Sequence, residues 1–163
     1  MSNIDQLDRT MTFIVDHPEK HDQRSWVCET GACLAGHAVL LNGYRAISQC
    51  DGLVVEAGSP AECEVEALLA FHQFTTTGWW ANQDLLLSAG ARKVRDVAIE
   101  ILDLIEADAE VLFGGANTID KLQLMVKDLS NGDVLEDLWL AINEDVWGNP
   151  YMVRRATPVG TSD

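Results

Sequence analysis

The segment from residue 28 to residue 38, CETGACLAGHA, holds the most chemically versatile side chains of this chain. Cys33 and His37 are four residues apart, so a helix would place them on one face. Two thiolates and an imidazole are ligands that zinc accepts, and Cys28, with His17 or His21, would complete a set. One hypothesis is therefore a metal-binding protein or an enzyme centred on Cys28, Cys33 and His37.

A structural role for the same residues is the alternative, and the pattern favours it. The paired cysteine and histidine spacings that are typical of zinc sites are missing. A Cys–His nucleophile pair would need an oxyanion donor and an orienting acid, and the neighbouring sequence indicates neither. Small cysteines beside a helix are usually core residues, and Gly36 in mid-helix indicates close approach of another helix. We therefore predict no catalytic residue, no metal and no cofactor.

Charge is the other notable feature. The chain of 163 residues has 26 acidic and 11 basic side chains, for a formal net charge of −15. Such a charge repels phosphates, so it argues against direct binding to nucleic acids or anionic membranes. It favours a protein partner with a basic surface. A charged exterior that only keeps the protein in solution is the competing interpretation.

Acidic residues are concentrated between positions 96 and 145. This stretch contains thirteen acidic side chains but only two lysines, Lys121 and Lys127. An acidic helical surface can occupy a basic site, including one built for nucleic-acid phosphates. The candidate partner-binding residues are Asp96, Glu100, Asp103, Asp133, Glu136 and Asp137.

Targeting signals are not evident. The N-terminus lacks a basic region followed by an apolar run, which argues against a signal peptide, and the apolar stretches are too short to span a bilayer. The four cysteines then fit a reduced cytoplasmic protein with free thiols. The oligomeric state is left open.

Apolar periodicity predicts an all-α fold of six or seven helices in one domain over residues 1–147, followed by a partly ordered tail at 148–163. A short strand pair is possible near 44–56, where Leu-Val-Val lies between turn signals. Trp26 is expected to fill the core from a loop, and Trp79-Trp80 to be a buried pair. Helices are predicted at about 3–16, 31–42, 60–74, 91–107, 118–130 and 133–146.

The first block of the chain resembles a group of small uncharacterised helical proteins of actinobacteria and their phages. The match includes His17-Pro18, Asp22-Gln23, Trp26 and the pattern Cys28-x-Thr30-x-Ala32-Cys33-x-Ala35-Gly36-His37-Ala38. Leu112-Phe113 followed by Asn117-Thr118 resembles a second block. In the group the position of His37 can be tryptophan, which implies packing rather than metal binding.

The resemblance implies a setting in a bacterial cytoplasm, that of the host if a phage encodes the protein. The prediction from the sequence is a non-enzymatic acidic protein that binds a host or phage protein. Mimicry of nucleic-acid charge is a special case of that hypothesis.

Overall fold

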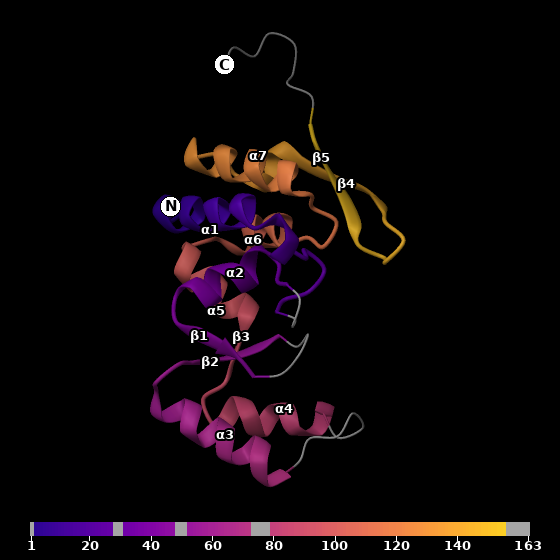
Figure 1. The fold of residues 1–163 in the computed structure, drawn as a ribbon. Helices are drawn as coiled ribbons and strands as arrows, with labels where there is room; N and C mark the ends of the chain where they lie inside the picture. The colour runs from indigo at the N-terminus through magenta and orange to yellow at the C-terminus, as the bar shows by residue number, and fades with distance from the viewer. Residues whose placement is uncertain (1, 28–30, 48–51, 73–78, 156–163) are drawn as a thin grey trace.

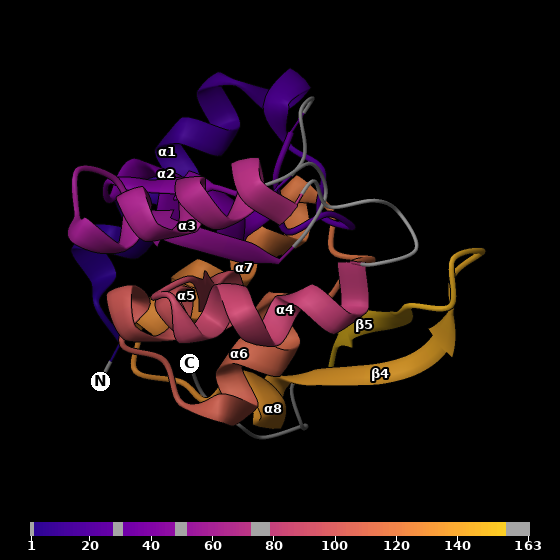
Figure 2. The same ribbon diagram turned by 90° about the horizontal axis from the view of Figure 1, so that it is seen from below.

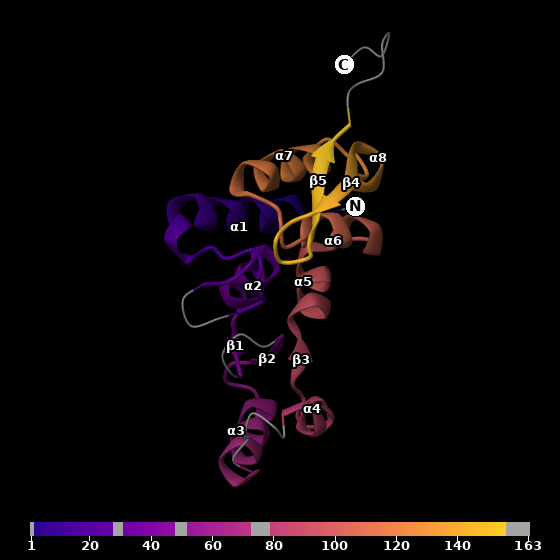
Figure 3. The ribbon, with the colours of Figure 1, turned by 90° about the vertical axis from the view of Figure 1, so that its right-hand side faces the viewer.

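The computed structural model describes residues 2–27, 31–47, 52–72 and 79–155, and within these ranges the chain forms eight α-helices, one 3₁₀ turn and five strands (Figure 1). The elements are stacked in layers (Figures 1 and 3). The helix at 119–130 and a strand hairpin at 139–154 form one end, the helices at 4–16, 34–41, 94–102 and 106–112 the middle, and a small sheet with the helices at 60–72 and 79–88 the other end. The protein is thus rich in helix, as predicted, but it also contains two small antiparallel sheets, so the all-α prediction is confirmed only in part.

The first helix follows the predicted pattern. Helix α1 spans Ile4–Asp16, begins at Asn3, whose side chain accepts a hydrogen bond from the Gln6 amide, and ends before His17-Pro18. A 3₁₀ turn, η1, follows at Pro18–Lys20. Helix α2 spans only Leu34–Leu41, so the predicted start at 31 is wrong because Cys33 is the capping residue. Thr30, a residue type that often caps helices and that precedes the predicted start at 31, lies outside the described residues.

A three-stranded antiparallel sheet confirms the strand pair predicted near 44–56 and adds a third strand. Strand β1 (Tyr44–Ala46) pairs with β2 (Leu53–Glu56), which pairs with β3 (Arg92–Lys93). Val54 packs into the main core, whereas Leu53 and Val55 pack into a second core on the α3 and α4 side. Strand β2 is therefore covered on both faces, which explains its three consecutive apolar residues.

Helices α3 (Pro60–His72) and α4 (Trp79–Ser88) form the layer at that end of the molecule (Figure 2). Val65 and Leu86 are buried between them and the sheet. The side chains of Trp79 and Trp80, predicted to be a buried pair, lie outside the described residues. No helix in the described ranges is long and apolar enough to cross a bilayer.

The helix predicted at 91–107 is two shorter helices. Helix α5 spans Val94–Leu102 and helix α6 spans Glu106–Leu112. The break is at Asp103, which has a φ of 51° and so adopts a left-handed conformation that ends α5. The periodicity missed this break because Leu104 is buried and continues the apolar pattern.

The end of the chain differs most from the prediction. Helix α7 (Ile119–Ser130) is confirmed, with Thr118 as its cap. The helix predicted at 133–146 is wrong: α8 is a single turn at Leu135–Leu138. The chain then forms an antiparallel hairpin, here called the C-terminal hairpin, from β4 (Trp139–Glu144) and β5 (Pro150–Arg154). The hairpin pairs residues of the predicted domain, 1–147, with residues of the predicted tail, 148–163.

Candidate functional site

Cys33 acts as the cap of helix α2. Its Sγ accepts a hydrogen bond from the Gly36 amide at 3.4 Å, and its thiol donates to the Trp26 carbonyl oxygen at 3.8 Å. The side chain is 2% exposed, and burial raises the pKa of the thiol to about 11. A thiol with this pKa is protonated at neutral pH and is a poor nucleophile or metal ligand.

Gly36 permits the closest backbone approach in the segment. A Cβ atom at this position would lie 1.8 Å from the Trp26 carbonyl oxygen and 2.9 Å from the Ala32 Cβ. The predicted close approach is therefore correct in kind, but the neighbour is the loop backbone at Trp26 rather than another helix. The Trp26 indole packs against the main core and meets Phe113 edge-on, with ring centroids 6.1 Å apart.

His37 lies within a cluster of rings on the α1 side of α2. Its ring centroid is 5.2 Å from that of Phe13 and 5.8 Å from that of His21, and Phe13 also contacts His17. Burial, together with the nearby His21, lowers the pKa of His37 to about 4, and burial also lowers the pKa of His21. Both rings are therefore neutral at pH 7 and pack as aromatic groups. The predicted packing role of Cys33 and His37 agrees with these contacts.

A metal site is not assembled from the candidate ligands that the structure describes. No group of three His, Cys, Asp or Glu residues within the described ranges could hold a metal ion. Cys28, the third member of the candidate set, lies outside those ranges. Three buried ring nitrogens, both of His21 and Nε2 of His37, have no hydrogen-bond partner among the described residues.

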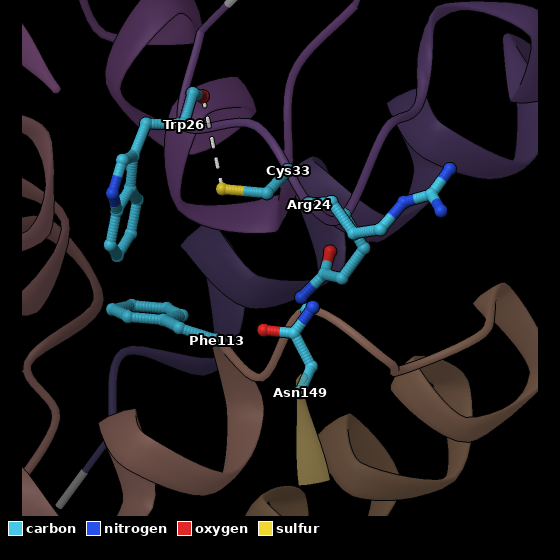
Figure 4. Close-up of a pocket in the computed structure, with 7 residues that line it drawn as sticks. Arg24, Trp26, Cys33, Phe113 and Asn149 are labelled. Carbon is cyan, nitrogen blue, oxygen red and sulfur yellow. Dashed lines mark hydrogen bonds between the residues drawn. The ribbon is translucent and has the colours of Figure 1, made fainter. Parts of the chain in front are cut away.

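A cavity of about 160 Å³ lies beside Cys33 and opens between the 23–26 loop, Phe113 and the turn of the C-terminal hairpin (Figure 4). Its polar lining already has structural roles. The Gln23 amide donates to the Leu112 carbonyl oxygen at 3.1 Å and accepts from the Leu34 amide at 3.2 Å, which ties α6 to α2. The Arg24 guanidinium points away from the two aromatic rings in Figure 4 and stacks over Trp147 instead.

The described lining of the cavity offers little acid–base chemistry. Its lining residues, as far as the structure describes them, contain no carboxylate or imidazole that could act as an acid or base at neutral pH. The thiol of Cys33 is protonated there. The lining residues are Gln23, Arg24, Trp26, Cys33, Phe113, Gly115 and Asn149.

The six predicted partner-binding carboxylates are all exposed, but they do not all have the same neighbours. Glu100 forms an ion pair with Arg92, whereas the other five have no ion pair within the described part of the chain. The exposed acidic residues follow the chain from α5 through α6 to α8, and α6 packs against α8. Glu106 on α6 pairs with Arg95, with one contact at 3.0 Å, and this ion pair lowers the pKa of the glutamate.

Two acidic residues of the same stretch are buried and structural. Asp108 accepts a hydrogen bond from the Leu135 amide at 2.8 Å and so caps α8. Asp128 accepts from the Trp139 indole at 3.1 Å and from Arg154 at 3.0 Å. The two bonds of Asp128 attach the C-terminal hairpin to α7. Sequence periodicity did not predict that Asp108 and Asp128 are buried.

The C-terminal hairpin has an exposed apolar face that the sequence did not predict. Cross-strand pairing sets Leu140 opposite Val153 and Ala141 opposite Met152. Trp139 and Met152 are buried against the body, whereas the other face of the hairpin is exposed. The signal was present as Gly148-Asn149-Pro150, a turn sequence between two β-prone runs.

Comparison with known protein families, with curated proteins and with solved structures finds no match for this chain. The resemblance to small actinobacterial and phage proteins therefore stays a prediction. Function has to be argued from the geometry alone.

Proposed function

We propose that this protein is not an enzyme and that it acts by binding another protein through its acidic exterior. The observation that carries the proposal is a set of exposed carboxylates on and just after α5 and around α8 that form no ion pair with the described residues: Asp96, Asp103, Asp133, Glu136 and Asp137. Unpaired surface carboxylates attract a partner with lysine and arginine residues, and they accelerate its association. Charges in ion pairs, such as Glu100 with Arg92, contribute less to this field.

The packing of the cysteine segment supports the same proposal. Cys33 caps a helix, Gly36 admits the Trp26 carbonyl, and His37 is a neutral ring in the core. The described members of the candidate metal or nucleophile site are thus engaged in holding the fold. A host or phage protein is the partner that the resemblance implies.

Affinity capture from an actinobacterial lysate, with and without phage infection, tests the proposal. The test variant neutralises the five carboxylates by Asp→Asn at 96, 103, 133 and 137 and Glu→Gln at 136. The control variant makes the same charge change elsewhere on the exposed surface, with Asp→Asn at 5, 8, 16 and 84 and Glu→Gln at 64. We expect a partner that elutes with salt and that the test variant loses while the control variant keeps it.

Two results would count against the proposal: no salt-sensitive partner of the wild-type protein, or equal loss of the partner in both variants. Added duplex DNA or RNA checks the special case of nucleic-acid mimicry. If the protein imitates phosphate charge, nucleic acid displaces it from the partner. If nucleic acid has no effect, the partner uses a different basic surface.

A further inference from the structure

The outer face of the C-terminal hairpin is a largely exposed apolar surface, contacted at one edge by Lys121 of α7, whose Nζ lies 5.9 Å from the centre of the Tyr151 ring. The register places Leu140 and Val153 side by side. Tyr151 is two residues from Val153 and so lies on the same side of β5, and Ile142 is two residues from Leu140 in β4, where the pairing with β5 becomes irregular between Ala141 and Glu144. Their exposed fractions are 45%, 43%, 52% and 40%. We call these four residues the hairpin face.

A hairpin face of this composition is not required by the fold. In antiparallel sheets with one face on the core, the other face usually carries polar side chains. Here Trp139 and Met152 already supply the packed face, and the opposite face is apolar as well. Contiguous exposed apolar groups of this size, on the order of a few hundred Å², typically mark an interaction site.

The hairpin is held in place before any partner arrives. Asp128 binds both Trp139 and Arg154, which anchors both strands near their junction with the body. At the other end, the Asp145 carboxylate accepts hydrogen bonds from the amides of Trp147 at 2.8 Å and Asn149 at 3.0 Å. A surface that is already ordered loses little conformational entropy on binding.

The charges beside the hairpin face define the occupant. Residues 133–155 contain five acidic side chains and two arginines, of which Arg154 is paired with Asp128. From outside this stretch, Lys121 lies over the Tyr151 ring and Arg24 over the Trp147 ring. The neighbouring carboxylates Glu136, Asp137 and Glu144 are exposed. Because the chain as a whole has a net charge of −15, the complementary surface is apolar at its centre and basic where it meets Glu136, Asp137 and Glu144. A second copy of this chain fits less well, because each copy has a net charge of −15.

We infer that the hairpin face is the docking centre for an apolar segment of a partner protein flanked by lysine or arginine residues. This inference rests on the proposed function and specifies where and how that binding occurs. Apolar contact supplies the affinity, and the surrounding carboxylates select a basic partner.

Two matched double variants separate the hairpin face from exposed apolar residues elsewhere. The test variant is L140S/V153S. The control is L85S/V15S, which makes the same two replacements on α4 and α1 at residues of nearly equal exposure, 45% and 44%. Neither pair is buried, so both variants should fold as the wild type does, which far-UV circular dichroism checks.

The probe is a short peptide of alternating leucine and lysine, added to ¹⁵N-labelled protein and followed by NMR. We expect amide shifts at residues 140–153, and binding at least about tenfold weaker in L140S/V153S but unchanged in L85S/V15S. Peptides of serine and lysine, or of leucine and glutamate, should bind far more weakly than the first peptide. Shifts elsewhere, equal binding by the acidic peptide, or equal loss in both variants would overturn the inference.

A dilution series of the protein alone tests whether a second copy of the chain binds the hairpin face. Concentration-dependent shifts confined to residues 140–153 would show that a second copy occupies the face, and this would overturn the choice of a basic partner. The lysate experiment tests the proposed function separately from the hairpin face. A partner that is still captured by L140S/V153S retains the proposed function but contradicts the hairpin face.

Discussion

The segment around Cys33 and the C-terminal hairpin use their residues in opposite ways. The first contains a thiol and an imidazole, which are reactive by type, yet both are buried and engaged in packing or capping. The second contains inert side chains, yet its hairpin face is left in solvent. The difference teaches that residue type indicates what chemistry is possible, whereas burial decides which groups can meet another molecule.

The largest expected effect is at Gly36. A Cβ at this position would overlap the Trp26 carbonyl oxygen, so G36A should lower the free energy of unfolding by more than about 3 kcal/mol. Gly58 is the control, because it has a φ of 79° and open space around it, so G58A should cost only about 1 kcal/mol. Urea unfolding followed by tryptophan fluorescence measures both. Equal costs for the two variants would show that the close approach is unimportant.

His37 should make the stability depend on pH. Its pKa is lowered to about 4 in the folded protein from an ordinary value of 6.5, so the unfolded chain binds the proton first. Stability is therefore full above pH 6.5 and falls as the pH drops toward 4, by up to about 3 kcal/mol. The variant H37F should flatten the slope between pH 6.5 and 5, although His21 contributes in the same direction.

The control for the histidine prediction is H17F, since the His17 side chain is 44% exposed at the edge of the same ring cluster. It should keep the slope of the wild-type protein. Urea midpoints at several pH values provide the measurement. If H37F and the wild type lose stability in parallel, the buried-ring account of His37 is wrong.

The packed face of the C-terminal hairpin should contribute to the stability of the fold, whereas its exposed face should contribute little. Met152 is buried against the body, so M152A should cost about 2 kcal/mol. Val153 is on the hairpin face, so V153A should cost less than about 0.5 kcal/mol. Thermal or urea unfolding gives both values. A large cost for V153A would mean that the face stabilises the fold and is not free for a partner.

The smallest perturbation is chemical labelling of the cysteines without any mutation. Cys63 is exposed, whereas Cys33 is buried with a pKa raised to about 11. Iodoacetamide at pH 7.5 should modify Cys63 at least about tenfold faster than Cys33. Peptide mapping by mass spectrometry reads each site separately. Faster modification of Cys33 would restore the hypothesis of a nucleophilic site.

Local sequence signals predicted the parts of the fold that depend on neighbouring residues. Apolar periodicity gave α1 and α7 their extent, and the His17-Pro18 pair marked the end of α1. The strand pair near 44–56 followed from Leu53-Val54-Val55 between turn signals. The buried state of Cys33 and His37 was also predicted, because glycine and alanine around them indicate close packing.

Tertiary contacts decided the parts that were predicted incorrectly. Leu135, Leu138, Trp139 and Ile142 fit a helical pattern, but the Trp139 indole is held by Asp128 from α7, and the chain extends from that point. The break at Asp103 depends on a left-handed residue that is not glycine. The hairpin face could not be inferred because Leu140 and Ile142 were assigned to a helix, whereas Tyr151 and Val153 were assigned to the tail.

The central claim is that the cysteine segment holds the fold while the exterior meets a partner. Capture of the lysate partner by C33S/H37F and by L140S/V153S tests this claim directly. We predict that folded C33S/H37F retains the partner, because serine can still cap α2 and phenylalanine can still pack against Phe13. L140S/V153S should lose it. Retention by L140S/V153S together with loss by folded C33S/H37F would contradict the account.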